Sequence, residues 1–250
     1  MQNLRTDEKR MKISFASTPT RTFRSAGRSI LTFATAAMSH RRVVKSAVFS
    51  IALLGAAGLS ARAGEVAISD GKSFAGWEGD TNTFWHLRDG AFVGGMLEKT
   101  VPHNDFLCTT RSYTNFVLKL QFKLEGKSGF INGGVQFRSQ RVPGFEVSGY
   151  QADMGDPAWW GSLYDESRRD KTLVKSNMEE LNQHLKRGDW NDYKIRCEGN
   201  HIQIWINGYQ TVDYHEADAS IPNFGIIGLQ IHGGAQALAS YKDIWIEELP

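Results

Sequence analysis

The sequence predicts an all-β protein, a sandwich of two antiparallel sheets, on the strength of three observations. Apolar and polar residues alternate with period two over many short stretches. Gly, Asn and Asp separate these stretches, as they do at tight turns. Roughly ten to twelve strands result, and so many short strands in one chain are typical of a sandwich or barrel.

The folded part is expected to follow a secretory signal peptide at residues 38–63. Basic residues within 40–45 precede the apolar run 47–59, and the small residues Ala61 and Ala63 mark a cleavage site. The run is shorter than the roughly 20 residues that a membrane-spanning helix needs. We therefore expect an exported protein, periplasmic or extracellular, with no stable membrane span after cleavage. An uncleaved anchor is the alternative.

Residues 1–37 precede this signal. Because a signal peptide normally opens a chain, we expect translation to begin at Met38 and residues 1–37 to be a leader without a role in the fold. A long, unusual leader is the alternative. Residues 64–250 then form one domain, long enough for a proper core.

The charge of this expected domain differs from that of the whole chain, whose formal net charge is +2. Eleven of the 29 Lys and Arg residues lie before Gly64, against two of the 27 Asp and Glu residues. The domain is left with 18 basic and 25 acidic residues, a net charge of −7. A nucleic-acid partner would need a basic patch, so we expect none.

The first hairpin is expected at residues 84–93, where Asp89-Gly90 separates two apolar runs. A short strand follows at 106–110. The clearest strand is 115–124, whose apolar residues share one face: Phe116, Leu118, Leu120, Phe122 and Leu124. This alternation indicates a sheet with one buried face. Further strands are expected at residues 134–139, 146–154, 192–198, 201–206, 209–214, 226–232 and 240–249.

The stretch 156–189 interrupts the β pattern. A short helix is expected there, with Ser176 as N-cap, Glu179 as the reciprocal capping residue and about Leu185 as its last residue. A long excursion of this kind between strands is often functional.

Three expected strands place polar pairs on one face, because residues two apart in a strand point the same way. Val135 and Phe137 would point into the core. The outward residues are Gln136, Arg138, Gln151, Asp153, Gln230 and His232. If the strands are neighbours, these residues form a polar floor that suits sugar hydroxyls. A solvated sheet face is the alternative.

The loop at residues 156–170 supplies further candidates. Trp159 and Trp160 offer flat faces on which a sugar ring can stack, unless they anchor the loop in the core. The other polar residues are Tyr164, Asp165, Glu166, Arg168 and Arg169. They form either a salt-bridged surface loop or part of a ligand site.

Other chemistries find little support. The sequence has no Gly-rich phosphate loop, Cys-x-x-Cys pair or Gly-x-Ser-x-Gly elbow. Of the histidines after residue 63, only His232 stands among other candidates, so we expect no metal site built from several histidines. A divalent cation held by carboxylate and carbonyl oxygens stays open, and no other cofactor is expected. Cys108 and Cys197 either pair or remain buried free thiols.

Five stretches, taken together and in order, are distinctive: GGVQFRS, VSGYQADMG, WWGSLYDESRR, DWNDYKIRCEGNHIQIWINGYQTVDY and GIIGLQIHGG. From about Val66 to Leu249 the chain resembles the 3-keto-disaccharide hydrolase family. The resemblance implies a concanavalin A-like jelly-roll sandwich with one concave sheet. It also implies cleavage, by elimination or hydrolysis, of small glycosides whose sugar carries a ketone at C3.

The resemblance also implies roles. A C3 ketone acidifies the C2 proton, so the site needs a base, a group that stabilises the enolate and an acid for the leaving oxygen. His232 is expected as the base, with Asp153 or Glu166 orienting or replacing it. Tyr164 or Glu166 would protonate the leaving oxygen.

The remaining candidates are expected to hold charge or hydroxyl groups. The enolate would be stabilised by Arg138 together with Arg168 or Arg169, and the hydroxyls would be held by Gln136, Gln151 and Gln230. The chain also departs from many relatives, because Gly149-Tyr150-Gln151-Ala152-Asp153 stands where they carry a Gly-aromatic-Glu-x-Gln stretch.

Two other functions remain open on the sequence. A carbohydrate-binding module would use the amides and aromatic rings without needing His232. An interaction domain of the cell envelope would expose large apolar patches, which the polar floor argues against.

Overall fold

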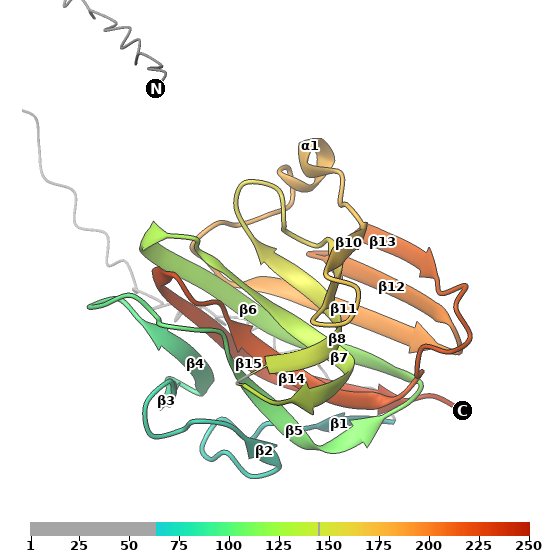
Figure 1. Cartoon of the computed structure of the whole chain (residues 1–250), viewed down its shortest axis with the longest axis horizontal. Coiled ribbons are helices and arrows are strands. Elements are labelled where there is room, and N and C mark those ends of the chain that lie inside the picture. Colours follow the sequence, from blue (N-terminus) through green and yellow to red (C-terminus); the bar gives the residue numbers. More distant parts are fainter. Residues whose placement is uncertain (1–63, 145) are drawn as a thin grey trace, which may run out of the picture. The chain divides into compact units, whose positions relative to one another are not determined.

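The computed structural model describes residues 64–144 and 146–250. The signal peptide and leader expected within residues 1–63 lie outside the described residues. The described strands form two antiparallel sheets layered one over the other (Figure 1). This architecture confirms the predicted all-β sandwich. In the described part of the chain, no helix is long and apolar enough to cross a membrane.

The first sheet has eight strands: β1 (Glu65–Ala67), β3 (Trp85–Arg88), β4 (Ala91–Met96), β6 (Phe116–Gly129), β11 (Asn191–Glu198), β12 (His201–Ile206), β13 (Tyr209–His215) and β15 (Ala235–Glu248). Their order is β13-β12-β11-β6-β15-β4-β3, with β1 also paired to β15. β13 is therefore an edge strand.

The second sheet has seven strands: β2 (Trp77–Glu78), β5 (Asp105–Tyr113), β7 (Asn132–Val142), β8 (Glu146–Gly155), β9 (Leu163–Glu166), β10 (Lys171–Val174) and β14 (Gly225–Ile231). Their order is β10-β9-β8-β7-β14-β5-β2. The three strands expected to carry polar pairs, β7, β8 and β14, are thus neighbours.

The core lies between the sheets and follows the predicted alternation. The five apolar residues of β6 that share one face are all buried: Phe116, Leu118, Leu120, Phe122 and Leu124. Phe122 packs on Tyr193 of β11 with ring centroids 4.8 Å apart. Burying such side chains contributes roughly 1.5–3 kcal/mol each.

Two buried tyrosines of the eight-stranded sheet bond to the backbone of the other sheet. The Tyr193 hydroxyl donates to the carbonyl oxygen of Asp153, 2.8 Å away. The Tyr241 hydroxyl lies 2.7 Å from the carbonyl oxygen of Gln230. A buried hydroxyl needs a hydrogen-bond partner. These bonds therefore hold the backbone of β8 and β14 in place at Asp153 and Gln230, two of the predicted site residues.

The excursion at residues 156–189 holds more structure than expected. It contains β9, β10 and the helix α1 (Met178–Leu181). The two strands were missed because each has only four residues and no clear alternation.

The predicted helix cap and helix end are wrong. Asn177 caps α1, accepting from the backbone N–H of Glu179 at 3.1 Å. Ser176 is buried, and its hydroxyl donates instead to the Trp160 carbonyl oxygen. The cap role therefore passes to the next residue, and the helix ends at Leu181 rather than Leu185.

The two cysteines are free thiols. Cys108 lies in β5 and Cys197 in β11, which belong to different sheets, and both are buried. Burial raises the pKa of each thiol to about 12. Neither is a nucleophile near neutral pH.

Candidate functional site

Polar side chains of β7 and β8 line the face of the seven-stranded sheet that points away from the core. Val135 fills the core, and its neighbour Gln136 points the other way, opposite Gln151. The Gln136 amide nitrogen donates to the Gln151 amide oxygen at 2.7 Å. The Gln151 amide nitrogen donates to Asp153 Oδ1 at 2.9 Å. Each amide thereby fixes the next side chain, and the relay ends on a carboxyl group.

Gln230 of β14 also belongs to this floor, and Gly134 of β7 lies between it and β8. Gln230, Gly134 and Asp153 lie side by side in the register of the three strands. A Cβ at Gly134 would lie 2.7 Å from the Gln151 side chain, so only glycine fits without a shift. The Gln230 amide nitrogen lies 3.4 Å from Glu166 Oε2 on β9. The polar floor that the structure forms thus consists of Gln136, Gln151, Asp153 and Gln230, without the Arg138 and His232 expected in it, and the name refers to these four residues below.

A cavity of about 170 Å³ opens beside the polar floor. Its lining residues are Phe130, Asn132, Gln151, Asp153, Trp159, Tyr164, Glu166 and His232. Six of these are candidates from the sequence, drawn from β8, β9, the loop between them and the residue after β14. We call this space the carboxyl cavity.

The two carboxyl groups of the cavity hold protons to unusually high pH. Burial raises the pKa of Asp153 to about 8, against hydrogen bonds from Gln151 and Asn132 that lower it. Burial also raises the pKa of Glu166 to about 7, aided by the nearby charge of Glu146. Groups that titrate near neutral pH in a cavity are suited to general acid and base chemistry.

His232 is oriented by the backbone of the residue that follows it. Its Nδ1 lies 2.6 Å from the carbonyl oxygen of Gly233. A carbonyl only accepts, so Nδ1 carries the proton and the neutral ring keeps a lone pair on Nε2. The ring also packs edge-to-face on Phe130 at 4.8 Å. This arrangement makes Nε2 the nitrogen that can take a proton.

Aromatic rings form the rim of the cavity. The Trp159 ring meets Phe130 at 6.2 Å and Tyr164 at 6.4 Å, both edge-to-face. Trp159 is half-buried. The apolar rim keeps water away from part of the site and offers a face for a sugar ring.

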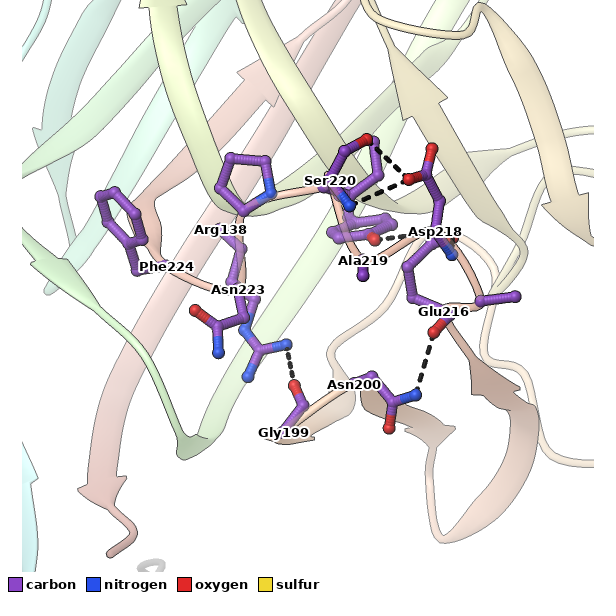
Figure 2. A pocket seen from close by; sticks show the side chains of 13 residues that line it. Arg138, Gly199, Asn200, Glu216, Asp218, Ala219, Ser220, Asn223 and Phe224 are labelled. Carbon is purple, nitrogen blue, oxygen red and sulfur yellow. Dashed lines mark hydrogen bonds between the residues drawn. The ribbon is translucent and has the colours of Figure 1, made fainter.

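Arg138 does not join this site, contrary to expectation. A bulge between β7 and β8 begins after Phe137, and Arg138 has φ 47°, so the alternation breaks. Its guanidinium turns toward the core side and donates to the carbonyl oxygens of Thr114 at 2.9 Å and Gly199 at 2.7 Å. Figure 2 shows it at the wall of a different pocket.

That second pocket is larger, about 550 Å³, but chemically less suited. Burial would raise the pKa of Glu216 in its wall, yet hydrogen bonds from Arg169 and Tyr150 lower it to about 2. None of its described lining residues is a histidine or a carboxyl group with a raised pKa. We therefore place the candidate site in the carboxyl cavity.

Arg168 and Arg169 also lie elsewhere. Both form ion pairs with buried Asp165, and Arg169 also pairs with Glu216 at 2.7 Å. Asp165 is the cross-strand partner of Tyr150, which faces the core, whereas Glu166 faces the cavity. Alternation along β9 thus separates the arginine cluster from the cavity.

Trp160 is a core residue and not a stacking platform. It is 3% exposed, and its indole nitrogen donates to Asp156 Oδ1 at 2.9 Å. Gln136 and Gln230 are likewise fully buried and do not line the cavity. They reach it only through Gln151 and Glu166.

Sequence reasoning missed two residues of the cavity. Asn132 shares the face of Gln136 because it lies four positions earlier in β7, so alternation carried further back would have found it. Phe130 precedes the strand and is 41% exposed. No local pattern marks it.

In the described part of the chain, the carboxyl cavity is not among the places where three ligand-type side chains come within reach of one ion. Among the described residues, one group of ligand-type side chains lies close enough to share an ion: His201, Asp213 and His215. It belongs to β12 and β13 of the other sheet. Two histidines far apart in the sequence, His201 and His215, are therefore neighbours in the fold.

Comparisons with known proteins agree with this fold. Residues 64–247 match the family described as the 3-keto-alpha-glucoside-1,2-lyase-like domain. No curated protein matches by sequence. A candidate glycosyl hydrolase from Parabacteroides distasonis superposes with a TM-score of 0.57 and 21% identity, over 75% of this chain and 95% of that one.

A carbohydrate-binding module and a protein with a galectin-like fold share the architecture as well. Carbohydrate-binding module CBM66 from Bacillus subtilis superposes with a TM-score of 0.54 and 15% identity, over 69% of this chain and 96% of that one. A Bacillus subtilis protein of unknown function with a galectin-like fold superposes with a TM-score of 0.52 and 10% identity, over 70% of this chain and 90% of that one. At such identities the likeness concerns the fold alone.

Proposed function

This chain belongs to the family of the 3-keto-alpha-glucoside-1,2-lyase-like domain, and from that premise we propose that it is a carbohydrate-active enzyme that cleaves 3-keto glycosides by elimination across C1 and C2. The observation that carries the proposal is the carboxyl cavity. It combines two carboxyl groups with pKa values of about 8 and about 7 and a histidine whose Nε2 can accept a proton.

The reaction needs one base and two proton donors. The base takes the C2 proton, which the neighbouring ketone makes acidic. The C1–C2 double bond forms as the C1–O bond breaks, and the leaving oxygen takes up a proton. Addition of water to the product would complete a net hydrolysis. Acetal hydrolysis would instead need two carboxyl groups on either side of the anomeric carbon.

His232 is proposed as the base. Its Nδ1 is engaged by the Gly233 carbonyl, so one tautomer is favoured and Nε2 is the proton acceptor.

Asp153 is proposed as the donor to the ketone oxygen. With a pKa of about 8 it is largely protonated at pH 7, and a neutral carboxyl group can donate to an oxygen that gains negative charge. This role replaces the one expected of Arg138, Arg168 and Arg169, which lie outside the cavity. The relay from Gln136 through Gln151 holds the carboxyl in place.

Glu166 and Tyr164 are proposed to serve the leaving oxygen. Glu166, with a pKa of about 7, is partly protonated at neutral pH. Burial raises the pKa of Tyr164, so its hydroxyl keeps its proton. Both side chains point to the same face of β9 and line the cavity.

The size of the cavity supports a single ring as the bound sugar. Its volume of about 170 Å³ is below the ~300–1000 Å³ of sites for larger ligands. The keto sugar would stack on Trp159 with its leaving group outside the cavity.

We also propose that the protein acts outside the cytoplasm. The mass of the chain recovered from the periplasm or medium tests cleavage after residue 63.

Mass spectrometry of paired substrates tests the proposed function. Purified full-length protein is incubated with a 3-keto-glucoside and, separately, with its unoxidised parent. We expect loss of the keto compound alone, and no loss with His232→Ala, whose folding is checked by circular dichroism. Binding of the keto sugar by calorimetry without any turnover would refute the enzyme and leave a carbohydrate-binding module, as in CBM66.

A further inference from the structure

Two histidines and an aspartate meet on the hairpin of β12 and β13. This hairpin belongs to the eight-stranded sheet, whereas the strands of the carboxyl cavity belong to the seven-stranded sheet. His201 and His215 are direct cross-strand partners, and Asp213 is the partner of Gln203 on the same face. Ile202 and Ile204 alternate with them and are buried in the core. The three side chains therefore share the outer face of the eight-stranded sheet.

The distances within this cluster match those of a chelating site. One ligand atom from each of the three residues lies within 4.8 Å of the others. His201 Nε2 is 2.7 Å from Asp213 Oδ1. The two imidazole rings are stacked, with centroids 4.0 Å apart and an angle of 11° between planes. A tetrahedral ion with bonds of ~2.0 Å needs its ligand atoms roughly 3.3 Å apart. An imidazole binds a metal in the plane of its ring, so the two stacked rings must rotate toward one another to share an ion.

Neighbouring amides orient the carboxylate as outer partners do in metal sites. Gln203 and Gln210 each donate to Asp213 Oδ2, at 3.1 and 3.2 Å. Oδ1 remains directed at the histidine pair. Hydrogen bonds of this kind fix the orientation of a ligand and raise metal affinity.

We propose that His201, Asp213 and His215 bind one divalent transition-metal ion, which clips the edge strand β13 to β12. Two imidazoles and one carboxylate favour Zn²⁺, Ni²⁺ or Cu²⁺ over Mg²⁺ and Ca²⁺, which prefer oxygen ligands. The open coordination positions face solvent, because Asp213 and His215 are exposed. The ion stabilises the folded hairpin because the unfolded chain does not hold the three ligands together.

Zinc titration of the full-length chain, purified without a histidine tag, tests the site. Calorimetry with ZnCl₂ is expected to show one ion per chain and a rise in the melting temperature. His215→Ala should lose at least tenfold in affinity together with that rise, and MgCl₂ should produce neither effect. Asp213→Asn, a nearly isosteric change, gives the second variant and should also weaken binding.

Two controls separate this site from others. His86→Ala removes a lone exposed strand histidine and should bind zinc as the wild type does. His232→Ala should do the same, which places the ion outside the carboxyl cavity. Equal zinc affinity in His215→Ala and wild type, absence of binding by the wild type, or loss of binding in His232→Ala would each overturn the proposal.

Discussion

Replacing Asp153 by Asn changes how stability depends on pH. The folded pKa of Asp153 is about 8 against an ordinary value of 3.8. Below pH 3.8 the carboxyl is protonated in the folded and unfolded states alike. Between the two values only the unfolded state releases the proton, so stability falls as pH rises. Above pH 8 both states are ionised and the loss is complete.

The size of this loss follows from linkage. Each pH unit inside the window lowers the free energy of unfolding by about 1.4 kcal/mol. Between pH 5 and 7.5 the wild type should therefore lose about 3 kcal/mol that Asp153→Asn does not lose. Asn stays neutral throughout, and its side-chain oxygen can still accept from Gln151.

Urea denaturation at pH 5, 6, 7 and 7.5 measures this difference. The control is Asp89→Asn, at an exposed turn residue whose φ of 51° suits Asn equally well. The control should follow the wild type at every pH. Parallel stability curves for Asp153→Asn and wild type would refute the raised pKa and, with it, the role of Asp153 as a neutral donor.

Three further predictions concern single side chains. His232→Ala should lower kcat on a 3-keto glucoside by about 10²–10⁴ without lowering the melting temperature, as expected on removing a general base; an unchanged kcat contradicts the assignment. Trp159→Ala should raise KM about tenfold, because one stacking contact with the sugar is lost. Trp160→Ala should instead lower the free energy of unfolding by about 3–5 kcal/mol. The reverse pattern would show that Trp159 is not the stacking residue. Arg138→Met should lower the free energy of unfolding in urea by about 3 kcal/mol, because it leaves buried carbonyl oxygens without donors. The kcat of the folded protein should not change, and a fall in kcat would show that Arg138 does belong to the site.

The sheet pattern was largely predictable because it depends on one local property. Alternation places the same residues on the same face wherever the strand ends up, as with Gln151 and Asp153 in β8 or Phe116 and Leu118 in β6. Adjacency of β7, β8 and β14 then gathers the polar residues into one floor.

The wrongly placed site residues lie where the alternation is interrupted, or where the packing of the core determines which of two similar side chains is buried. The bulge at Arg138 turns its side chain away from the floor. Arg168 and Arg169 follow a short strand in which only every second residue faces the cavity, and the ion pairs with Asp165 hold them on the other side. Nothing in the adjacent Trp159 and Trp160 indicates which one enters the core.

The meeting of His201 and His215 depends on register, which a sequence fixes only through its turns. The Asn207-Gly208 turn pairs Ile206 with Tyr209, and a register shift between Ile204 and Trp205 then moves the pairing by one residue. His201 therefore meets His215 rather than Tyr214. The positions of the histidines in the sequence therefore do not reveal which of them are cross-strand partners.

The kinetic isotope effect at C2 tests the central claim most directly. A 3-keto-glucoside carrying deuterium at C2 and its protium form are compared with wild-type protein. The proposed elimination predicts cleavage several-fold slower for the deuterated sugar, because the C2–H bond breaks in the reaction. Cleavage at equal rates, together with turnover of the unoxidised parent, would instead indicate acetal hydrolysis and contradict the assignment of the carboxyl cavity as an eliminating site.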